Sequence, residues 1–332
     1  MKQMRKKWNW AILGCGKIAE KFSLDLKLLS NARLYATASR SLEKAQNFAN
    51  EYGYVKAFGS YKEMLSDPEV DIVYIATPHS FHRDHTILCL NNKKAVLCEK
   101  AFALNSTQVS DMVKSSKVNN TFLMEAFWTR FQPFFLELTK ILKSGRLGNC
   151  KMMRSDFAFN GPYDPENRLY NLDLGGGSLL DIGIYPVFWA LQSFGTPEKI
   201  SATADFCHTG SEESIAITFQ YPDGRIASLM SSFAVYTDTK TEFWCEKGFI
   251  QIKRDGTSST ILQIKESDGT EETLNFTNDK AFGYHLEAAH VMDCLDAGKI
   301  ESDLLPLSFS LTLIETLDKI REAAGIVYPA DS

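Results

Sequence analysis

The sequence has little of what would mark a membrane, secreted or nucleic-acid-binding protein. No run approaches the ~20 apolar residues that a membrane span needs. The formal net charge is −5, without a basic footprint, which argues against nucleic-acid binding. The seven cysteines form no Cys-x-x-Cys pair, and an odd count without paired spacing favours a reducing compartment. Four basic residues open the chain, but the apolar run behind them is too short for a secretion signal, so we expect a solvated arm and a cytoplasmic protein.

The 332 residues are enough for about two domains. The first 125 residues alternate between apolar runs and amphipathic stretches, which is typical of a doubly wound parallel sheet. The apolar runs predict strands at 10–13, 34–38, 72–76, 95–98 and 122–124. The amphipathic stretches predict helices at 17–29, 42–52, 61–65, 82–91 and 107–118, with Ser41 and Ser106 as N-caps.

The pattern changes after residue 125. Helices are predicted at 137–144 and 177–194. From Lys199, strands alternate with turn signals at 222–224, 247–248, 255–256 and 268–269, which indicate an antiparallel sheet of hairpins. Two helices, about 284–297 and 307–323, end the chain. We therefore predict a Rossmann domain over 1–125 and an α+β domain with a large, mostly antiparallel open sheet over 126–332. The final helix is a candidate to return to the first domain.

The first predicted strand leads into a glycine-rich turn and a helix. Gly14-x-Gly16-x-x-Ala19 matches the dinucleotide fingerprint, with alanine as an accepted third residue. Gly14 allows the tight turn, Gly16 lets the backbone approach a pyrophosphate, and the helix N-terminus offers N–H groups to the phosphates. Cys15, Lys17 and Ile18 belong to the same turn.

The end of the second strand favours NADP over NAD. NAD sites usually place a carboxylate there for the ribose 2′-hydroxyl. This chain instead has Ser39, Arg40 and Ser41, with Lys44 one turn on. A guanidinium and hydroxyls suit a 2′-phosphate. The alternative is that Arg40 is only a solvated loop residue.

Two further segments follow the ends of predicted strands, where parallel sheets bind ligands. Thr77 and Pro78 precede three histidines, His79, His82 and His85, whose spacing drifts off one helix face, so we expect no metal there. His79 is a candidate near the nicotinamide or substrate, whereas His85 is expected at the surface or half-buried. Glu99-Lys100 follows the fourth apolar run, 95–98; an exposed ion pair is the simpler alternative.

A glycine-rich segment opens the helix predicted at 177–194. Gly175-Gly176-Gly177 suggests close backbone approach or a special turn, since glycine does not favour helix. The spacing of four places Asp181 and Tyr185 on one helix face. A core tyrosine with a satisfied hydroxyl is the alternative for Tyr185.

Together these motifs resemble the glucose-fructose oxidoreductase / inositol dehydrogenase / MocA family over nearly the whole chain. Within that family the chain is most similar to the dimeric dihydrodiol dehydrogenases. The segments that carry this similarity are Val96–Lys100, Leu123–Phe131 and Leu179–Tyr185.

The resemblance implies an NADP-dependent oxidoreductase that transfers a hydride between the nicotinamide and a carbinol of a vicinal diol, trans-dihydrodiol or sugar. It implies Lys100 as the catalytic lysine, Asp181 as the carboxylate that orients substrate, and Tyr185 where many members carry histidine. Trp128 and Phe157 would line the substrate pocket with His79. The resemblance also implies a homodimer.

Two residues depart from the family pattern. Ala101 follows Lys100 where proline is usual, and because a cis bond before alanine costs ~2.5–4 kcal/mol, we predict a trans bond or a locally strained turn. The tyrosine at position 185 disfavours chemistry like that of inositol dehydrogenase.

We predict that Tyr185 exchanges the substrate hydroxyl proton while Lys100 polarises the substrate oxygen. A free tyrosine has a pKa near 10 and is a poor base, but a neighbouring ammonium lowers that pKa. Aromatic residues suit the face of a ring, and the candidates are Phe127, Trp128, Phe131, Phe157 and Phe159. A sugar dehydrogenase or reductase of the xylose or deoxyhexosulose type, and a catalytically silent NADP-binding regulator, are the alternatives.

Overall fold

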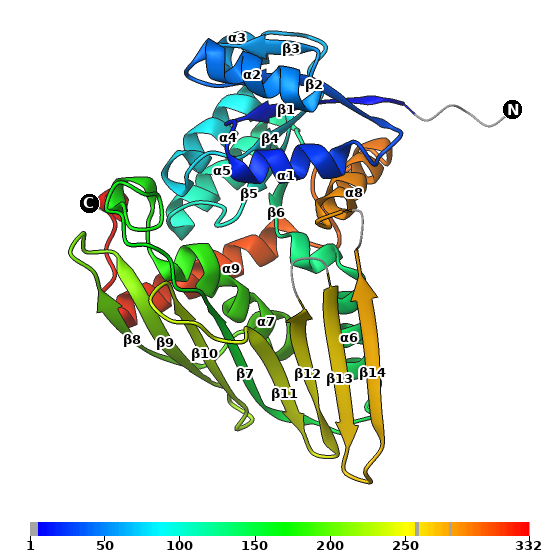
Figure 1. Cartoon of the computed structure of the whole chain (residues 1–332), viewed down its shortest axis with the longest axis vertical. Helices are drawn as coiled ribbons and strands as arrows, with labels where there is room; N and C mark the ends of the chain where they lie inside the picture. Colours follow the sequence, from blue (N-terminus) through cyan, green and yellow to red (C-terminus); the bar gives the residue numbers. More distant parts are fainter. Residues whose placement is uncertain (1–5, 256–258, 279–280, 332) are drawn as a thin grey trace, which may run out of the picture. The chain divides into compact units, whose positions relative to one another are not determined.

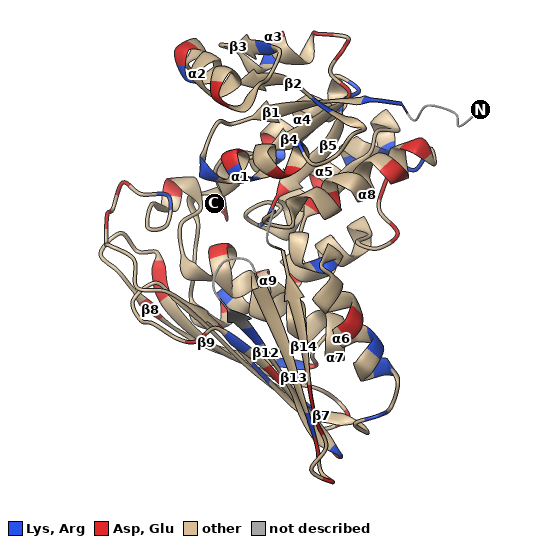
Figure 2. Ribbon diagram, turned by 45° about the vertical axis from the view of Figure 1, so that its right-hand side comes forward, with Lys and Arg blue, Asp and Glu red and all other residues tan. Residues whose placement is uncertain are grey.

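The computed structural model describes residues 6–255, 259–278 and 281–331. The basic residues Lys2 and Arg5 and the turn residue Gly256 lie outside this part. The chain divides into two compact units. Unit 1 comprises Met1–Ala103, Thr107–Phe131 and Lys280–Leu311, and unit 2 comprises Leu104–Ser106, Gln132–Asp279 and Thr312–Ser332. Acidic and basic residues alternate along the ribbon of both units (Figure 2), in keeping with the mixed charge of the sequence.

Unit 1 contains a parallel sheet whose strand order, among the described residues, is β3-β2-β1-β4-β5-β6 (Figure 1). This order is that of the dinucleotide-binding fold and confirms the predicted doubly wound sheet. Both faces of the central strands are covered, and all four residues of β4 are buried. The strands are β1 (Trp8–Leu13), β2 (Ala32–Ala38), β3 (Lys56–Phe58), β4 (Ile72–Ile75), β5 (Ala95–Glu99) and β6 (Leu123–Ala126). The short β3 was not predicted.

The helices of unit 1 follow local signals closely. Ser41 caps its helix as predicted, its Oγ accepting a hydrogen bond from the Lys44 N–H at 3.3 Å, and Gly53 ends that helix with φ 81°. The helices are α1 (Lys17–Leu26), α2 (Leu42–Tyr52), α3 (Tyr61–Leu65), α4 (His82–Asn91), α5 (Ser106–Asn119) and α8 (Tyr284–Asp296). Ser106 is therefore the first residue of its helix, whereas the sequence predicted it as the N-cap of a helix beginning at residue 107.

A buried carboxylate attaches α8 to the dinucleotide-binding part of the sequence. Asp25, near the end of α1, accepts hydrogen bonds from the backbone N–H groups of Phe282, Gly283 and Tyr284 at 2.7–2.9 Å. These N–H groups have no partner inside the helix, so the side chain of a distant residue satisfies them. In contrast, only the start of α9 (Leu307–Ala324) belongs to unit 1, since residues from Thr312 on belong to unit 2.

Unit 2 is built on a sheet with the described strand order β14-β13-β12-β11-β7-β10-β9-β8. Neighbouring strands are antiparallel except β7 and β10, which run parallel, so the mostly antiparallel sheet is confirmed. The strands are β7 (Cys150–Ala158), β8 (Lys199–Phe206), β9 (Glu212–Gln220), β10 (Ile226–Ser232), β11 (Lys240–Cys245), β12 (Gly248–Asp255), β13 (Ser259–Glu266) and β14 (Glu271–Thr277). The central strand β7 was not predicted, because it precedes the run of hairpins and carries no turn signal of its own.

Helices α6 (Pro133–Lys143) and α7 (Ile184–Phe194) pack on one face of this sheet (Figure 1). The residues facing them, such as Met153, Phe243 and Ile250, are fully buried. The segment 172–194 is long and apolar enough, with mean hydropathy 1.3, to meet the criterion for a membrane span, contrary to the sequence expectation. However, 89% of its apolar window is buried inside the protein, as is usual for a core helix.

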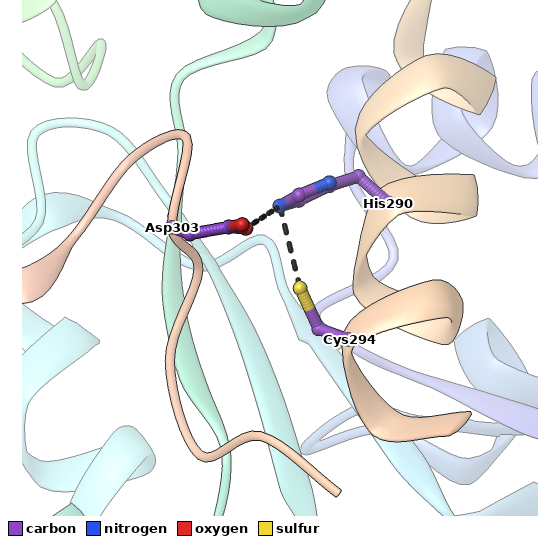
Figure 3. A group of neighbouring side chains, drawn as sticks. All are labelled: His290, Cys294 and Asp303. Atoms are coloured by element: carbon purple, nitrogen blue, oxygen red, sulfur yellow. Dashed lines mark hydrogen bonds and ion pairs between the residues drawn. The ribbon is translucent and has the colours of Figure 1, made fainter. Parts of the chain in front are cut away.

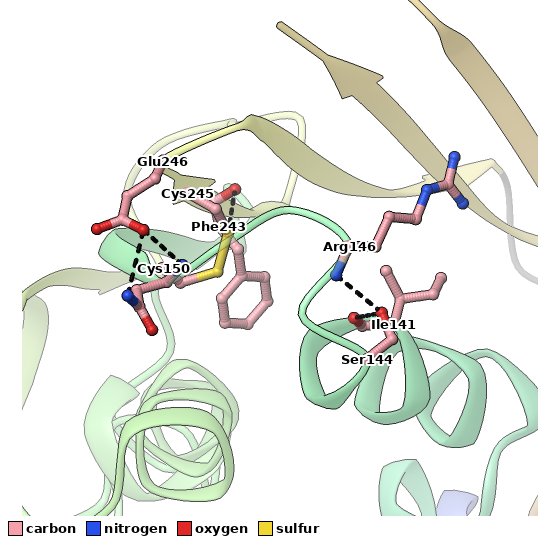
Figure 4. Close-up of a disulfide and its surroundings, with 8 residues drawn as sticks. Ile141, Ser144, Arg146, Cys150, Phe243, Cys245 and Glu246 are labelled. Carbon is pink, nitrogen blue, oxygen red and sulfur yellow. Dashed lines mark hydrogen bonds between the residues drawn. A yellow bond between two sulfur atoms is a disulfide. The ribbon is translucent and has the colours of Figure 1, made fainter.

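A disulfide joins Cys150 of β7 to Cys245 of β11 (Figure 4). The two residues are register partners on neighbouring antiparallel strands but lie 95 positions apart in sequence. The spacing argument, which treated the cysteines as free thiols, was wrong for this pair because strand pairing is not visible in local spacing. The described free cysteines are Cys15, Cys89, Cys98, Cys207 and Cys294.

Candidate functional site

The strands of the unit 1 sheet end at one level. Leu13 pairs with both Ala38 and Ile75, and Cys98 pairs with Ile75 and with Glu125. The segments that follow these positions therefore emerge at one edge of the sheet, on both sides of the point where the strand order reverses between β1 and β4. The edge brings together four of the predicted segments, namely Gly14–Ile18, Ser39–Lys44, Thr77–His82 and Glu99–Lys100.

The glycine turn has the geometry that a dinucleotide requires. Gly14 has φ 101°, and a Cβ on it would lie 2.9 Å from Thr77 Cγ2 and 3.0 Å from the Ala76 oxygen, so only glycine fits. A Cβ on Gly16 would meet no described atom within 4 Å, which leaves its backbone open to a phosphate. Gly16 caps α1 without a side-chain bond, and the N–H groups of Lys17 and Ile18 lie in the first turn, where phosphates bind. These residues fit a dinucleotide.

Cys15, between the two glycines, faces the protein. Its Sγ donates to the Ala38 oxygen at 3.8 Å, and burial raises the pKa of the thiol to about 11. The thiol therefore stays protonated near neutral pH, and only the backbone of Cys15 is suited to a phosphate.

The residues after β2 form a basic, hydroxyl-bearing corner. Ser39 is nearly buried, and its Oγ accepts a hydrogen bond from the Ser41 N–H at 3.4 Å. Arg40 and Lys44 are exposed. Burial is the main cause of the lowered pKa of His85; the Asp84 charge opposes this shift, and the Arg40 guanidinium adds to it. The positive charge expected for a 2′-phosphate is therefore present at this edge.

The three histidines have separate roles. His82 is fully buried, with Nδ1 2.8 Å from the Ala101 oxygen and Nε2 2.7 Å from the Thr77 oxygen. Burial lowers its pKa to about 3, and because a neutral imidazole has a single N–H, the ring donates a hydrogen bond to only one of these two oxygens. His85 is half-buried, as expected, and its Nδ1 lies 3.1 Å from Thr77 Oγ1. His79 is nearly buried, its ring 5.6 Å from that of His82.

The Glu99-Lys100 pair lies directly at the end of β5. The Glu99 carboxylate accepts hydrogen bonds from the Tyr74 hydroxyl and from the Lys100 backbone N–H, the latter at 3.2 Å. The Lys100 side chain is partly exposed. The Lys100-Ala101 peptide is cis, so the predicted trans bond was wrong. Ala101 is fully buried and its oxygen contacts His82, so tertiary contacts override the local preference of the dipeptide.

The sequence reasoning missed a buried acid behind this edge. Glu125, the register partner of Cys98, is nearly inaccessible, and burial raises its pKa to about 7. The charge of Glu99 raises this pKa further, and the charge of Lys100 opposes the shift. A carboxylate inside the apolar segment 122–127 was the available signal.

In unit 2, Asp181 and Tyr185 lie on consecutive parts of one helical segment. Residues Leu179–Gly183 form a π-helical turn that leads into α7, whereas a continuous α-helix was predicted. π-turns are frequent at functional sites. Asp181 is nearly buried and pairs with Arg168, whose Nη1 lies 3.0 Å from its Oδ1. The partly exposed Tyr185 ring lies 5.6 Å from that of Phe157. Arg168 was not predicted.

The glycines before this segment are required by close packing, as predicted. A Cβ on Gly176 would lie 2.7 Å from the Asn171 nitrogen, and one on Gly177, at φ 128°, would lie 2.3 Å from Glu212 Oε2. The buried Glu212 accepts a hydrogen bond from the Leu179 N–H at 2.8 Å, and burial raises its pKa to about 7. Glu212 thus holds the start of the helix that carries Asp181 and Tyr185, and no local pattern marked it.

The aromatic candidates divide between core and surface. Phe127 and Phe131 are buried in unit 1. Trp128 is partly exposed, and its ring lies 5.8 Å from that of Tyr284. Phe159 packs on Phe233 in a core cluster of unit 2.

A six-stranded sheet of this order among the described residues, with a glycine turn fitted to phosphates, defines a dinucleotide-binding Rossmann protein. The comparisons with known proteins make the class more specific. Residues 8–127 match the model of an oxidoreductase family with an NAD-binding Rossmann fold, and residues 135–251 match the GFO/IDH/MocA C-terminal domain. The chain belongs to this GFO/IDH/MocA family and is an NAD(P)-dependent oxidoreductase.

Full-length relatives support this assignment. The chain is 37% identical to trans-1,2-dihydrobenzene-1,2-diol dehydrogenase of Xenopus laevis over 97% of this chain and 99% of the relative. It is 36% identical to the human enzyme of the same name over 97% and 98%. A solved structure of an aldose-aldose oxidoreductase from Caulobacter crescentus has a TM-score of 0.86 at 25% identity, covering 96% and 98% of the two chains. A 3-ketoreductase from Actinomadura kijaniata, solved with NADP, shares the fold with a TM-score of 0.87 at 22% identity.

Proposed function

We propose that this protein transfers a hydride between NADP and a carbinol of a vicinal diol, a trans-dihydrodiol or a sugar. The observation that carries this proposal is the position of Lys100, one residue beyond β5 at the edge that also holds the glycine turn. The names of the full-length relatives support the diol as substrate class.

The basic corner after β2 supports NADP as the preferred cofactor. Arg40 and Lys44 are exposed there beside the Ser39 and Ser41 hydroxyls. No carboxylate lies among residues 37–41 that would repel a 2′-phosphate. NAD remains the second candidate.

We propose that Tyr185 exchanges the proton of the substrate hydroxyl and that Lys100 polarises the substrate oxygen. The nicotinamide, when bound, accepts or donates the hydride. Tyr185 is suited to its role because its ring is partly exposed and is oriented by Phe157. Asp181, held by Arg168, would orient a second hydroxyl of the substrate. Trp128, His79 and Phe157 are the proposed lining of the substrate site.

The decisive variant is Tyr185→Phe, which removes the phenolic hydroxyl and keeps the ring. Turnover of trans-dihydrodiols is expected to fall by ~10²–10⁴-fold, the usual contribution of a positioned acid or base. NADPH binding, followed by fluorescence titration, should be unchanged. Tyr236→Phe, at a tyrosine that is 79% exposed, is the matched control and should retain full turnover. Near-normal turnover in Tyr185→Phe would assign the proton transfer to Lys100 instead.

The same turnover and NADPH-binding assays test two alternative functions. A panel of xylose-type and deoxyhexosulose-type sugars, monitored at the nicotinamide absorbance, tests whether a sugar is preferred to a dihydrodiol. A silent NADP-binding regulator is the second alternative; it would bind NADPH without turning over either panel. The retention of Lys100 and Tyr185 favours an enzyme.

We propose that the protein is a homodimer that pairs through the sheet of unit 2. An apolar row crosses the face opposite the helix-facing residues, with Ile226, Met152, Trp244 and Phe249 in register on four strands. Met152 is 42% exposed, and such rows favour burial against another surface. Met152→Lys is expected to lower the sedimentation coefficient from that of a dimer to that of a monomer. A wild-type protein that already sediments as a monomer would contradict the proposal. We also propose a cytoplasmic location, which the five described free cysteines support and against which the Cys150–Cys245 disulfide counts.

A further inference from the structure

Three side chains with different donor atoms converge near the end of α8 in unit 1 (Figure 3). His290 and Cys294 stand four residues apart on the helix, and Asp303 comes from the segment that follows it. Their donor atoms all lie within 4.8 Å of one another. Neither the glycine turn nor the Lys100 edge uses any of these residues.

The distances suit a tetrahedral metal ion. Bonds of ~2.0–2.3 Å at tetrahedral angles separate neighbouring ligand atoms by roughly 3.3–3.7 Å. His290 Nε2 lies 3.3 Å from Cys294 Sγ and 3.9 Å from Asp303 Oδ1. The Cys294 and Asp303 donor atoms lie within 4.8 Å of each other, so Asp303 must approach by up to about 1 Å to complete a tetrahedral site. Its side chain is 64% exposed and is therefore able to turn toward the ion.

The surroundings already orient the first two donors. The Phe131 ring packs 5.0 Å from the His290 ring, and Cys294 is buried against the body of the helix. Ser302 Oγ accepts hydrogen bonds from the Leu304 and Leu305 N–H groups and lies 2.7 Å from His290 Nε2, so a metal ion at this nitrogen must displace the Ser302–His290 hydrogen bond. One nitrogen, one sulfur and one oxygen form a donor set typical of zinc rather than of magnesium or calcium.

We propose that His290, Cys294 and Asp303 bind a zinc-like divalent ion, and that this ion fastens α8 to the segment after it. That segment is part of the unit 1 architecture, because the Ile300 oxygen accepts a hydrogen bond from the Leu123 N–H at the start of β6 at 3.1 Å. Binding releases the thiol proton of Cys294 to solvent and involves no redox step. The ion would be structural, with Asp303 or a water on its exposed side.

Lys299 competes with the ion for one ligand. Its Nζ lies 3.0 Å from Asp303 Oδ2, and Arg130 adds a second positive charge near His290. A metal ion must displace the Lys299 ammonium from Asp303. Removing that ammonium should therefore tighten metal binding, whereas a fortuitous site elsewhere would not respond.

Cobalt(II) titration of the full-length protein tests the proposal without any measurement of activity. A thiolate–cobalt charge-transfer band should appear at one equivalent and be displaced by zinc. Cys294→Ser should abolish the band, His290→Ala and Asp303→Asn should weaken binding at least ~10-fold, and Lys299→Gln should strengthen it. Cys207→Ser, at a partly exposed free cysteine of unit 2, is the matched control and should leave the band intact.

Asp303→Asn keeps the test valid if a helix variant fails to fold, because Asp303 is exposed. Zinc should also raise the melting temperature of the wild type, but not that of Asp303→Asn. Absence of the band, or a band that survives in Cys294→Ser, would overturn the proposal. So would identical cobalt affinity in the wild type, Asp303→Asn and Lys299→Gln; the three side chains would then form only a hydrogen-bonded cluster.

Discussion

Both units bury a carboxylate directly behind the segment that carries their candidate functional groups, but they position those groups differently. In unit 1, Glu125 is a register partner in the sheet, and the functional segments emerge where parallel strands end. In unit 2, Glu212 reaches from a strand to the backbone N–H of Leu179 and holds a helix start. In unit 1 the shared direction of the parallel strands positions the functional segments. In unit 2 a single hydrogen bond between residues distant in sequence positions the helix. The unit 2 arrangement should therefore be easier to break with one substitution.

Gly177→Ala is the largest expected perturbation of unit 2. The new Cβ would overlap the Glu212 carboxylate at 2.3 Å and occupy φ 128°, so we expect a loss of about 3–5 kcal/mol in the free energy of unfolding. The control is Gly195→Ala at the other end of α7, where φ is 81° but a Cβ meets no described atom within 4 Å. Its backbone (φ 81°, ψ −162°) lies in a region that is essentially restricted to glycine, so this variant should cost ~1–3 kcal/mol from backbone strain alone, without the overlap. Equal losses in urea unfolding of the two variants would refute the role of Glu212 packing.

Glu125→Gln examines the buried acid of unit 1 through pH. Burial raises the pKa of Glu125 from 4.5 in the unfolded chain to about 7, so the native state holds a proton that the unfolded state releases. The resulting stabilisation, roughly 3 kcal/mol, is complete below pH 4.5 and is lost as the pH rises to 7. Glutamine does not ionise, so the Glu125→Gln variant does not lose unfolding free energy in this way as the pH rises.

The measurement for Glu125 is urea unfolding of both proteins between pH 4.5 and 8. The difference in stability between wild type and variant should change across this range in favour of the variant at high pH. Glu51→Gln, at an exposed glutamate of the same unit, should show no such change. A constant difference for Glu125→Gln would mean that this carboxyl is ionised throughout.

Arg40→Ala has the smallest expected effect and concerns only the cofactor. A charge-assisted bond to a 2′-phosphate contributes ~1.5–3 kcal/mol, so NADPH should bind ~10–100-fold more weakly while NADH is unaffected. Arg33→Ala, near the start of β2 and so away from its carboxyl end, is the control. Calorimetric titration with both nucleotides decides the matter, since equal weakening for both would show that Arg40 does not distinguish them.

The accuracy of the sequence predictions also differs between the units. Helices α2, α3 and α4 begin and end where their apolar periodicity predicts, and the strand-end segments meet at one edge because parallel strands share a direction. The central strand β7, the π-turn before α7 and the disulfide were missed. Each depends on partners far along the chain, which local periodicity does not contain.

The sequence by itself determined the doubly wound sheet, the phosphate-binding turn, the basic corner after β2 and the residue types that carry the proposed chemistry. Local causes suffice for these features, namely steric freedom at Gly14, capping by Ser41 and apolar runs covered on both faces. Only the tertiary structure decided the cis peptide after Lys100, the burial of Glu125 and Glu212, and the pairing of Cys150 with Cys245. In each case atoms distant in sequence supply the contacts or exclude the water, so the outcome depends on which elements pack together.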